Sequence, residues 1–113
     1  MDQKKLMTRV KYKTDNERLN INSLVYFIAD TAIFTVNNLV NQKGALMMAW
    51  LEGDTLHTKT LYEPATQATI SKVLTMEDKD AKLIMLSDGM IVILSIKDPK
   101  GCTPQIVKQQ TKA

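Results

Sequence analysis

The sequence predicts an α+β domain in which one long helix over residues 23–42 packs against an antiparallel sheet of five to six strands. Two observations lead to this class. Apolar residues recur with a helical period in residues 23–42, whereas most of the other residues form short alternating or apolar runs separated by turn residues. We therefore expect the order strand, helix, and then four or five antiparallel strands.

The first predicted strand covers residues 6–13. Leu6, Thr8, Val10 and Tyr12 alternate with Met7 and basic residues, as in a strand that buries one face. Residues 14–17 are polar and indicate a turn after this strand.

The segment 23–42 is rich in β-branched and aromatic residues, so its propensity alone favours a strand. Its periodicity favours a helix, because nine apolar residues fall on one half of a helical wheel and the serine, aspartate and asparagine residues on the other. The apolar half consists of Leu24, Val25, Ile28, Ala29, Ala32, Ile33, Val36, Leu39 and Val40. Ser23 suits the N-cap and Gly44 the C-terminal stop, so we predict a helix.

Phe27 and Phe34 lie seven residues apart within the polar half of this predicted helix, on either side of Asp30. Two phenylalanines exposed to water would be unfavourable. We therefore expect this side to face a partner subunit or a closed pocket, with Asp30 in partly apolar surroundings.

The chain after Gly44 reads as strands. They are predicted at 45–51, 55–62, 68–76, 81–87 and 90–96, with Asp88-Gly89 as a strong hairpin signal between the last two. Residues 83–86 and 90–94 are apolar at every position, and such strands need cover on both faces. One helix covers one face, so we expect another subunit on the other. The predicted domain spans residues 1–97, and residues 98–113 form a polar C-terminal tail.

Composition restricts the function classes. The 113 residues suffice for one domain, and the formal charge of +3 together with few aromatic residues argues against nucleic-acid binding. Cys102 is the only cysteine and His57 the only histidine, so we expect neither a disulfide nor a metal site. No signal peptide or apolar run long enough to span a bilayer is apparent, which predicts a cytoplasmic protein.

The order of the predicted elements, together with the run from Phe27 to Phe34 (Phe-Ile-Ala-Asp-Thr-Ala-Ile-Phe), resembles the hot-dog fold and, within it, the phenylacetyl-CoA-type acyl-CoA thioesterases. In that family a Leu-Ala-Asp-Thr-Ala run on the central helix carries the catalytic aspartate. The segment 61–65, Leu-Tyr-Glu-Pro-Ala, resembles the end of the family's next strand. The resemblance implies a long central helix wrapped by a curved antiparallel sheet.

The resemblance also implies a site. Asp30 would be the nucleophile or general base in thioester hydrolysis, with Thr31 assisting, while backbone N–H groups near Asn22 and Ser23 would polarise the carbonyl. Phe27 and Phe34 would contact the acyl chain between subunits of a homodimer or a dimer of dimers. Acyl-CoA would be the substrate or ligand, and no other cofactor is expected.

Alternatives remain for each residue and for the whole chain. Asp30 could be an ordinary surface or interface carboxylate, Asn22 and Ser23 could cap the helix, and Thr31 could bond within it. The family usually has His-Gly-Gly where this chain has Ile21-Asn22-Ser23. That difference favours a second hypothesis, a non-catalytic module that binds an acyl ligand or a protein. A third, less favoured hypothesis is a small basic nucleic-acid-binding domain.

Overall fold

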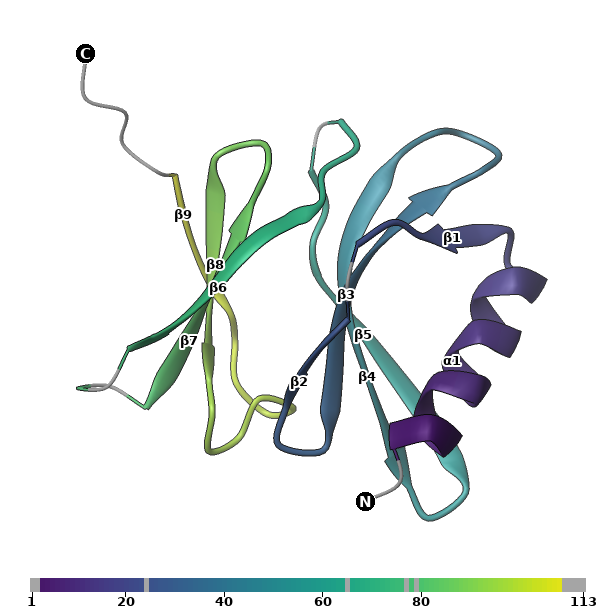
Figure 1. Cartoon of the computed structure of the whole chain (residues 1–113), viewed down its shortest axis with the longest axis horizontal. Coiled ribbons are helices and arrows are strands. Elements are labelled where there is room, and N and C mark those ends of the chain that lie inside the picture. Colours follow the sequence, from purple (N-terminus) through teal and green to yellow (C-terminus); the bar gives the residue numbers. More distant parts are fainter. Residues whose placement is uncertain (1–2, 24, 65, 77, 79, 109–113) are drawn as a thin grey trace.

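The computed structural model describes residues 3–23, 25–64, 66–76, 78 and 80–108, and over these residues the chain forms three layers (Figure 1). The first layer is the helix α1 (Gln3–Asn16). The second layer, here called sheet A, contains β1 (Leu19–Ile21), β2 (Tyr26–Ile28), β3 (Thr31–Asn38), β4 (Gly44–Glu52) and β5 (Thr55–Tyr62). The third, here called sheet B, contains β6 (Ile70–Met76), β7 (Ala81–Leu86), β8 (Met90–Ser95) and β9 (Gln105–Lys108).

Both sheets are antiparallel and follow the chain order closely. In sheet A the order is β1-β3-β4-β5, and β2 also pairs with β3, so β1 and β2 lie along the same edge. Sheet B is a meander in the order β6-β7-β8-β9. Sheet A lies between α1 and sheet B, and its two faces are therefore both covered (Figure 1).

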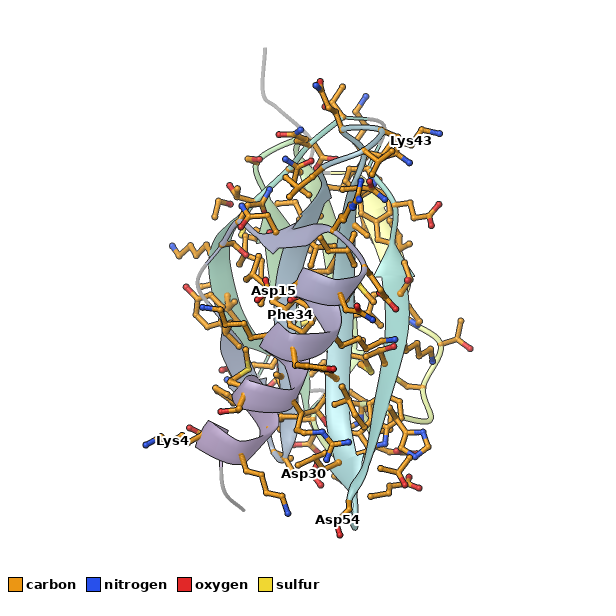
Figure 2. The ribbon with its side chains drawn as sticks, turned by 90° about the vertical axis from the view of Figure 1, so that its right-hand side faces the viewer. Lys4, Asp15, Asp30, Phe34, Lys43 and Asp54 are labelled. Carbon is orange, nitrogen blue, oxygen red and sulfur yellow. The ribbon has the colours of Figure 1, made fainter. Side chains whose placement is uncertain are left out.

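Two apolar clusters fill the spaces between the layers. Ile33, Met48, Ile84 and Val92 belong to the cluster between the two sheets, and each of them is 0% exposed. Leu6 and Val10 of α1 pack with Phe34 and Val36 of β3 in the second cluster. Figure 2, with α1 towards the viewer, shows Phe34 behind the helix.

The predicted helix over residues 23–42 is wrong, because this segment contains β2, a two-residue turn, β3 and the start of the β3–β4 loop. Residues 31–36 of β3 are buried on both faces, so buried residues do not alternate with exposed ones along this strand. Three of its apolar residues, Ala32, Ile33 and Val36, also fall on the apolar half of the helical wheel. Asn37, Asn38 and Asn41, which suggested a polar helix face, lie at the end of β3 and in the loop. The β-branched and aromatic side chains therefore follow their strand propensity.

The predicted strand over residues 6–13 is also wrong, since these residues lie within α1. Leu6, Val10 and Thr14 are buried at four-residue spacing, which is the spacing of one helix face. Tyr12 would share the buried face of a strand, but its side chain is 77% exposed. The lysines, arginine and methionine of the segment are good helix formers.

The strands predicted after Gly44 are confirmed as β4 to β8, with ends that differ by up to two residues. Gly53 and Gly89 have φ values of +61° and +89° in the two hairpin turns, where a residue without Cβ fits best. Residues 105–108, within the segment predicted as a polar tail, pair with β8 as β9.

The hot-dog fold is therefore contradicted. The described helix has 14 residues and lies at the N-terminus on one face of sheet A, rather than at the centre of a curved sheet. Across the described ranges, no helix combines the length and apolar character that crossing a membrane requires.

Candidate functional site

Asp30 lies in the tight turn between β2 and β3, where Ile28 pairs with Thr31. The preceding residue, Ala29, has a φ of +55°, an unfavourable value for a residue with a Cβ. Asp30 therefore lies at the tip of a hairpin at one end of the molecule (Figure 2), and not on a helix between two phenylalanines as predicted.

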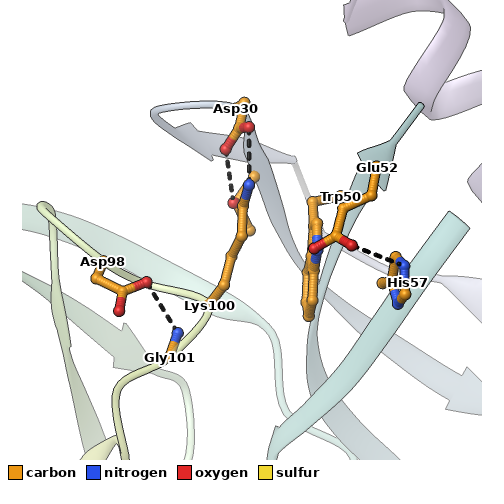
Figure 3. Close-up of polar contacts among 8 residues, drawn as sticks. Asp30, Trp50, Glu52, His57, Asp98, Lys100 and Gly101 are labelled. Carbon is orange, nitrogen blue, oxygen red and sulfur yellow. Dashed lines mark hydrogen bonds and ion pairs between the residues drawn. The ribbon is translucent and has the colours of Figure 1, made fainter. Parts of the chain in front are cut away.

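The Asp30 carboxylate is held by two neighbours. The ammonium group of Lys100 donates a hydrogen bond to Asp30 Oδ2 at 2.8 Å, and the hydroxyl of Thr31 donates to Oδ1 at 3.3 Å (Figure 3). The hydrogen bond from Lys100 lowers the pKa of Asp30, partial burial opposes this, and the positive charge of Lys100 adds to the lowering. At neutral pH Asp30 is therefore an ionised carboxylate that is paired with the ammonium group of Lys100.

Asn22 and Ser23 are half-buried and contact Thr35 of β3, which is 1% exposed. The Thr35 hydroxyl donates to Asn22 Oδ1 at 2.5 Å and lies 2.7 Å from Ser23 Oγ, which accepts the Thr35 backbone N–H at 3.2 Å. Asn22 and Ser23 follow β1 directly, beyond the pair formed by Ile21 and Val36. Their side chains therefore hold the chain after β1 to β3, and they do not cap a helix.

Phe27 and Phe34 belong to the cluster between sheet A and α1. Phe34 is 1% exposed and pairs with Met47 of β4. The structure thus brings Asp30 to Thr31, Asn22 to Ser23, and Phe27 to the same cluster as Phe34. It does not join these three pairs into the single site that the sequence predicted.

An aromatic pair that sequence reasoning missed lies on the β4–β5 hairpin. The rings of Trp50 and His57 stack with centroids 5.5 Å apart and an interplanar angle of 12°. Glu52 accepts the indole N–H of Trp50 at 3.3 Å and lies 3.4 Å from His57 Nε2 (Figure 3). The two-residue turn at Gly53-Asp54 places positions 50 and 57 opposite each other. The register of this hairpin was therefore the sequence signal from which the Trp50–His57 pair could have been predicted.

A groove of about 670 Å³ lies at the opposite end of sheet A from Asp30. Leu19, Val36 and Met47 contribute apolar surface, while Glu17 and Glu63 together with Lys43 bring charges of both signs. None of the expected site residues lines it, and its mixed charges favour no single charged ligand. Among the described residues, no three His, Cys, Asp or Glu side chains gather where they could hold a metal ion.

A further feature without an assigned role is the face of sheet B that points away from sheet A. The strand registers define this face, because Val73, Ile84 and Val92 align and point into the core, so their neighbours in each strand point outward. Its apolar members, here called the outer face of sheet B, are Leu74, Met76, Leu83, Met85, Ile91, Ile93 and Val107. None of them belongs to either buried cluster.

Polar residues border the outer face of sheet B rather than interrupt it. Lys72 lies on the edge strand β6 in the row that continues through Met85 and Ile91. Gln105 lies on the edge strand β9, opposite Ile93. Leu74 and Val107, also on the two edge strands, are 38% and 39% exposed. In Figure 1 no described helix or strand lies against this face, whereas α1 covers the far side of sheet A.

Comparison of the chain with protein-family models, with curated proteins and with solved structures gives no match.

Proposed function

We propose that this chain is a non-catalytic interaction module that binds a protein partner through the outer face of sheet B. The observation that supports this most strongly is a four-stranded sheet with apolar side chains on both faces. Within the part of the chain that the structure describes, one of these faces packs against the other elements and the second does not. Large exposed apolar patches on folded proteins commonly mark interaction sites.

The size of the face supports binding of a macromolecule. Four strands about 4.8 Å apart and about six residues long, at about 3.3 Å each, give a face of roughly 400 Å². At about 25 cal/mol per Å² of apolar surface, covering it contributes at most roughly 10 kcal/mol before the entropy cost of association is subtracted, because part of the face is polar and its central side chains are half-buried. Because association itself costs about 4–15 kcal/mol, this gross contribution supports a weak and reversible contact.

A photo-cross-linking experiment tests the proposal. The photoreactive residue p-benzoylphenylalanine replaces Met85, at the centre of the face, in cells that make the chain. The matched control carries it at Val40, which is 71% exposed on the β3–β4 loop. We expect a light-dependent protein adduct at position 85 and none at position 40. No adduct at position 85, or equal adducts at both positions, would overturn the proposal.

Hydrolysis of an acyl thioester by Asp30 stays a separate prediction from the family resemblance. The helix start that would polarise the thioester carbonyl is not formed by Asn22 and Ser23, and Lys100 already pairs with Asp30. The non-catalytic proposal therefore expects that a panel of acyl-CoAs is hydrolysed no faster by the wild type than by Asp30→Asn. A loss of turnover specific to this variant would support the enzyme instead.

A further inference from the structure

We infer that the partner on the outer face of sheet B is a second copy of this chain, packed sheet against sheet about a twofold axis. This inference rests on the proposed function, because it names the occupant of the same surface. Three properties of the face lead to it: its width, its near absence of charge, and the position of its polar border.

The width of the face fits a sheet better than a helix. Four strands about 4.8 Å apart span about 19 Å, whereas a helix with its side chains is about 10–12 Å across. A single helix would leave roughly half of the apolar residues in water. A second four-stranded sheet, packed at the usual distance of about 10 Å, would cover the outward side chains of all four strands.

The charge on the face favours an identical partner. Lys72 is the one charged residue among the outward positions of the four strands as their registers define them. Because this face carries so little charge, electrostatic attraction would favour neither an acidic nor a basic partner. Two identical copies can meet there without placing like charges at the centre of the contact.

The position of Lys72 is compatible with twofold symmetry. A twofold axis parallel to the strands sets β6 of one copy opposite β9 of the other, so Lys72 of one copy faces Val107 of the other. An axis across the strands sets β6 opposite β6 with the rows reversed, so Lys72 faces Met76. In both arrangements the two Lys72 side chains lie at different corners of the contact, and Leu83 and Met85 remain central.

The area predicts a weak dimer. Two faces of roughly 400 Å² each give about 800 Å² of flat contact, which is below the value of about 1,000 Å² that stable, specific interfaces exceed and falls in the range of weak, transient contacts. The contact closes on itself under a twofold axis, so association ends at two copies. We therefore expect a reversible monomer–dimer equilibrium rather than a permanent assembly.

Sedimentation equilibrium of the full chain over a wide concentration range tests the inference. The average mass is expected to rise from 12.7 kDa towards twice that value and no further. Leu83→Lys buries a charge twice in the symmetric contact and is expected to raise the dimer Kd by about 100-fold or more. Val40→Lys, the same chemical change on the exposed loop, is expected to leave the Kd unchanged.

Circular dichroism checks that Leu83→Lys still folds, and Leu74→Lys on the edge strand, where the side chain is already 38% exposed, serves as a second variant. A constant mass of 12.7 kDa, a mass beyond the dimer, or equal weakening by Val40→Lys would overturn the second copy as partner. If the wild type stays monomeric while the probe at position 85 captures a different protein, this inference fails and the proposed function stands. If position 85 captures nothing, the proposed function fails as well.

Discussion

Asp30 and Lys100 are 70 residues apart in the chain, yet their side chains form an ion pair with an N–O distance of 2.8 Å. The pair ties the β2–β3 turn of sheet A to the loop between β8 and β9 of sheet B. It therefore links the two sheets directly, outside their shared apolar core.

The Asp30–Lys100 pair gives the stability of the fold a defined pH dependence. Lys100 lowers the pKa of Asp30 below its ordinary value of 3.8, so the ionised form is favoured in the folded state. The stabilisation is present above the unfolded pKa and is lost as the pH falls through the lower folded pKa. Because the Lys100 and Asp30 side chains are 29% and 43% exposed, we expect Asp30→Asn to cost less than about 1 kcal/mol at neutral pH.

Urea unfolding of the wild type and Asp30→Asn at pH 7 and in acid below the folded pKa measures this effect. The difference in unfolding free energy should shrink towards zero in acid. Asp80→Asn is the matched control, because its partner Lys97 is 78% exposed and a smaller loss is expected. A difference that is constant over the whole pH range would show that the ion pair is not its source.

Thr35 is expected to matter more for stability than its size suggests. Thr35→Val keeps the shape of the side chain but removes the hydroxyl that contacts Asn22 and Ser23. The two half-buried side chains lose a partner, and we expect a cost of about 1–3 kcal/mol in unfolding free energy.

Thr31→Val provides the comparison for Thr35→Val in the same denaturation experiment. Thr31 is also buried, but its hydroxyl donates only to Asp30, which keeps Lys100 as a partner. We expect a smaller loss for Thr31→Val. Equal losses for both variants would mean that the attachment of Asn22 and Ser23 to β3 does not depend on the Thr35 hydroxyl.

Ala29 offers a stabilising substitution. Its φ of +55° costs about 1–2 kcal/mol for a residue with a Cβ, and glycine removes most of that cost while gaining freedom in the unfolded chain. The net expectation for Ala29→Gly is a gain of about 0.5–1 kcal/mol, seen as a rise of a few degrees in Tm. Gly89→Ala, at a φ of +89°, makes the reverse change and should lower Tm. A fall in Tm for Ala29→Gly would contradict the left-handed turn.

The hairpins after Gly44 were predictable because their signals are local. Asp88-Gly89 and Gly53-Asp54 specify turns through the chemistry of two adjacent residues, and the strand registers follow from the turns. The unbroken apolar runs at residues 83–86 and 90–94 predicted cover on both faces of their sheet, and the second subunit expected on one of them stays a prediction. Sheet A, rather than the expected helix, covers one of these faces.

The middle strand β3 was not predictable from periodicity, because a strand buried on both faces carries no alternation to detect. Its apolar residues matched a helical wheel by coincidence, and only their β-branched and aromatic character pointed to a strand. The Asp30–Lys100 pair was hidden for another reason. It is a tertiary contact between two turns, and neither turn contains a sequence signal for the other.

A final prediction separates the observed helix α1 from the strand that its alternating sequence suggested. In a strand, Val10 and Tyr12 would lie on the same buried face, and truncating either would be costly. In α1, Val10 is 1% exposed and packs in the cluster with Phe34, whereas Tyr12 is 77% exposed. We therefore expect Val10→Ala to cost about 1–3 kcal/mol in unfolding free energy and Tyr12→Ala less than about 0.5 kcal/mol. Denaturant unfolding of the two variants measures both values, and comparable losses would favour the strand.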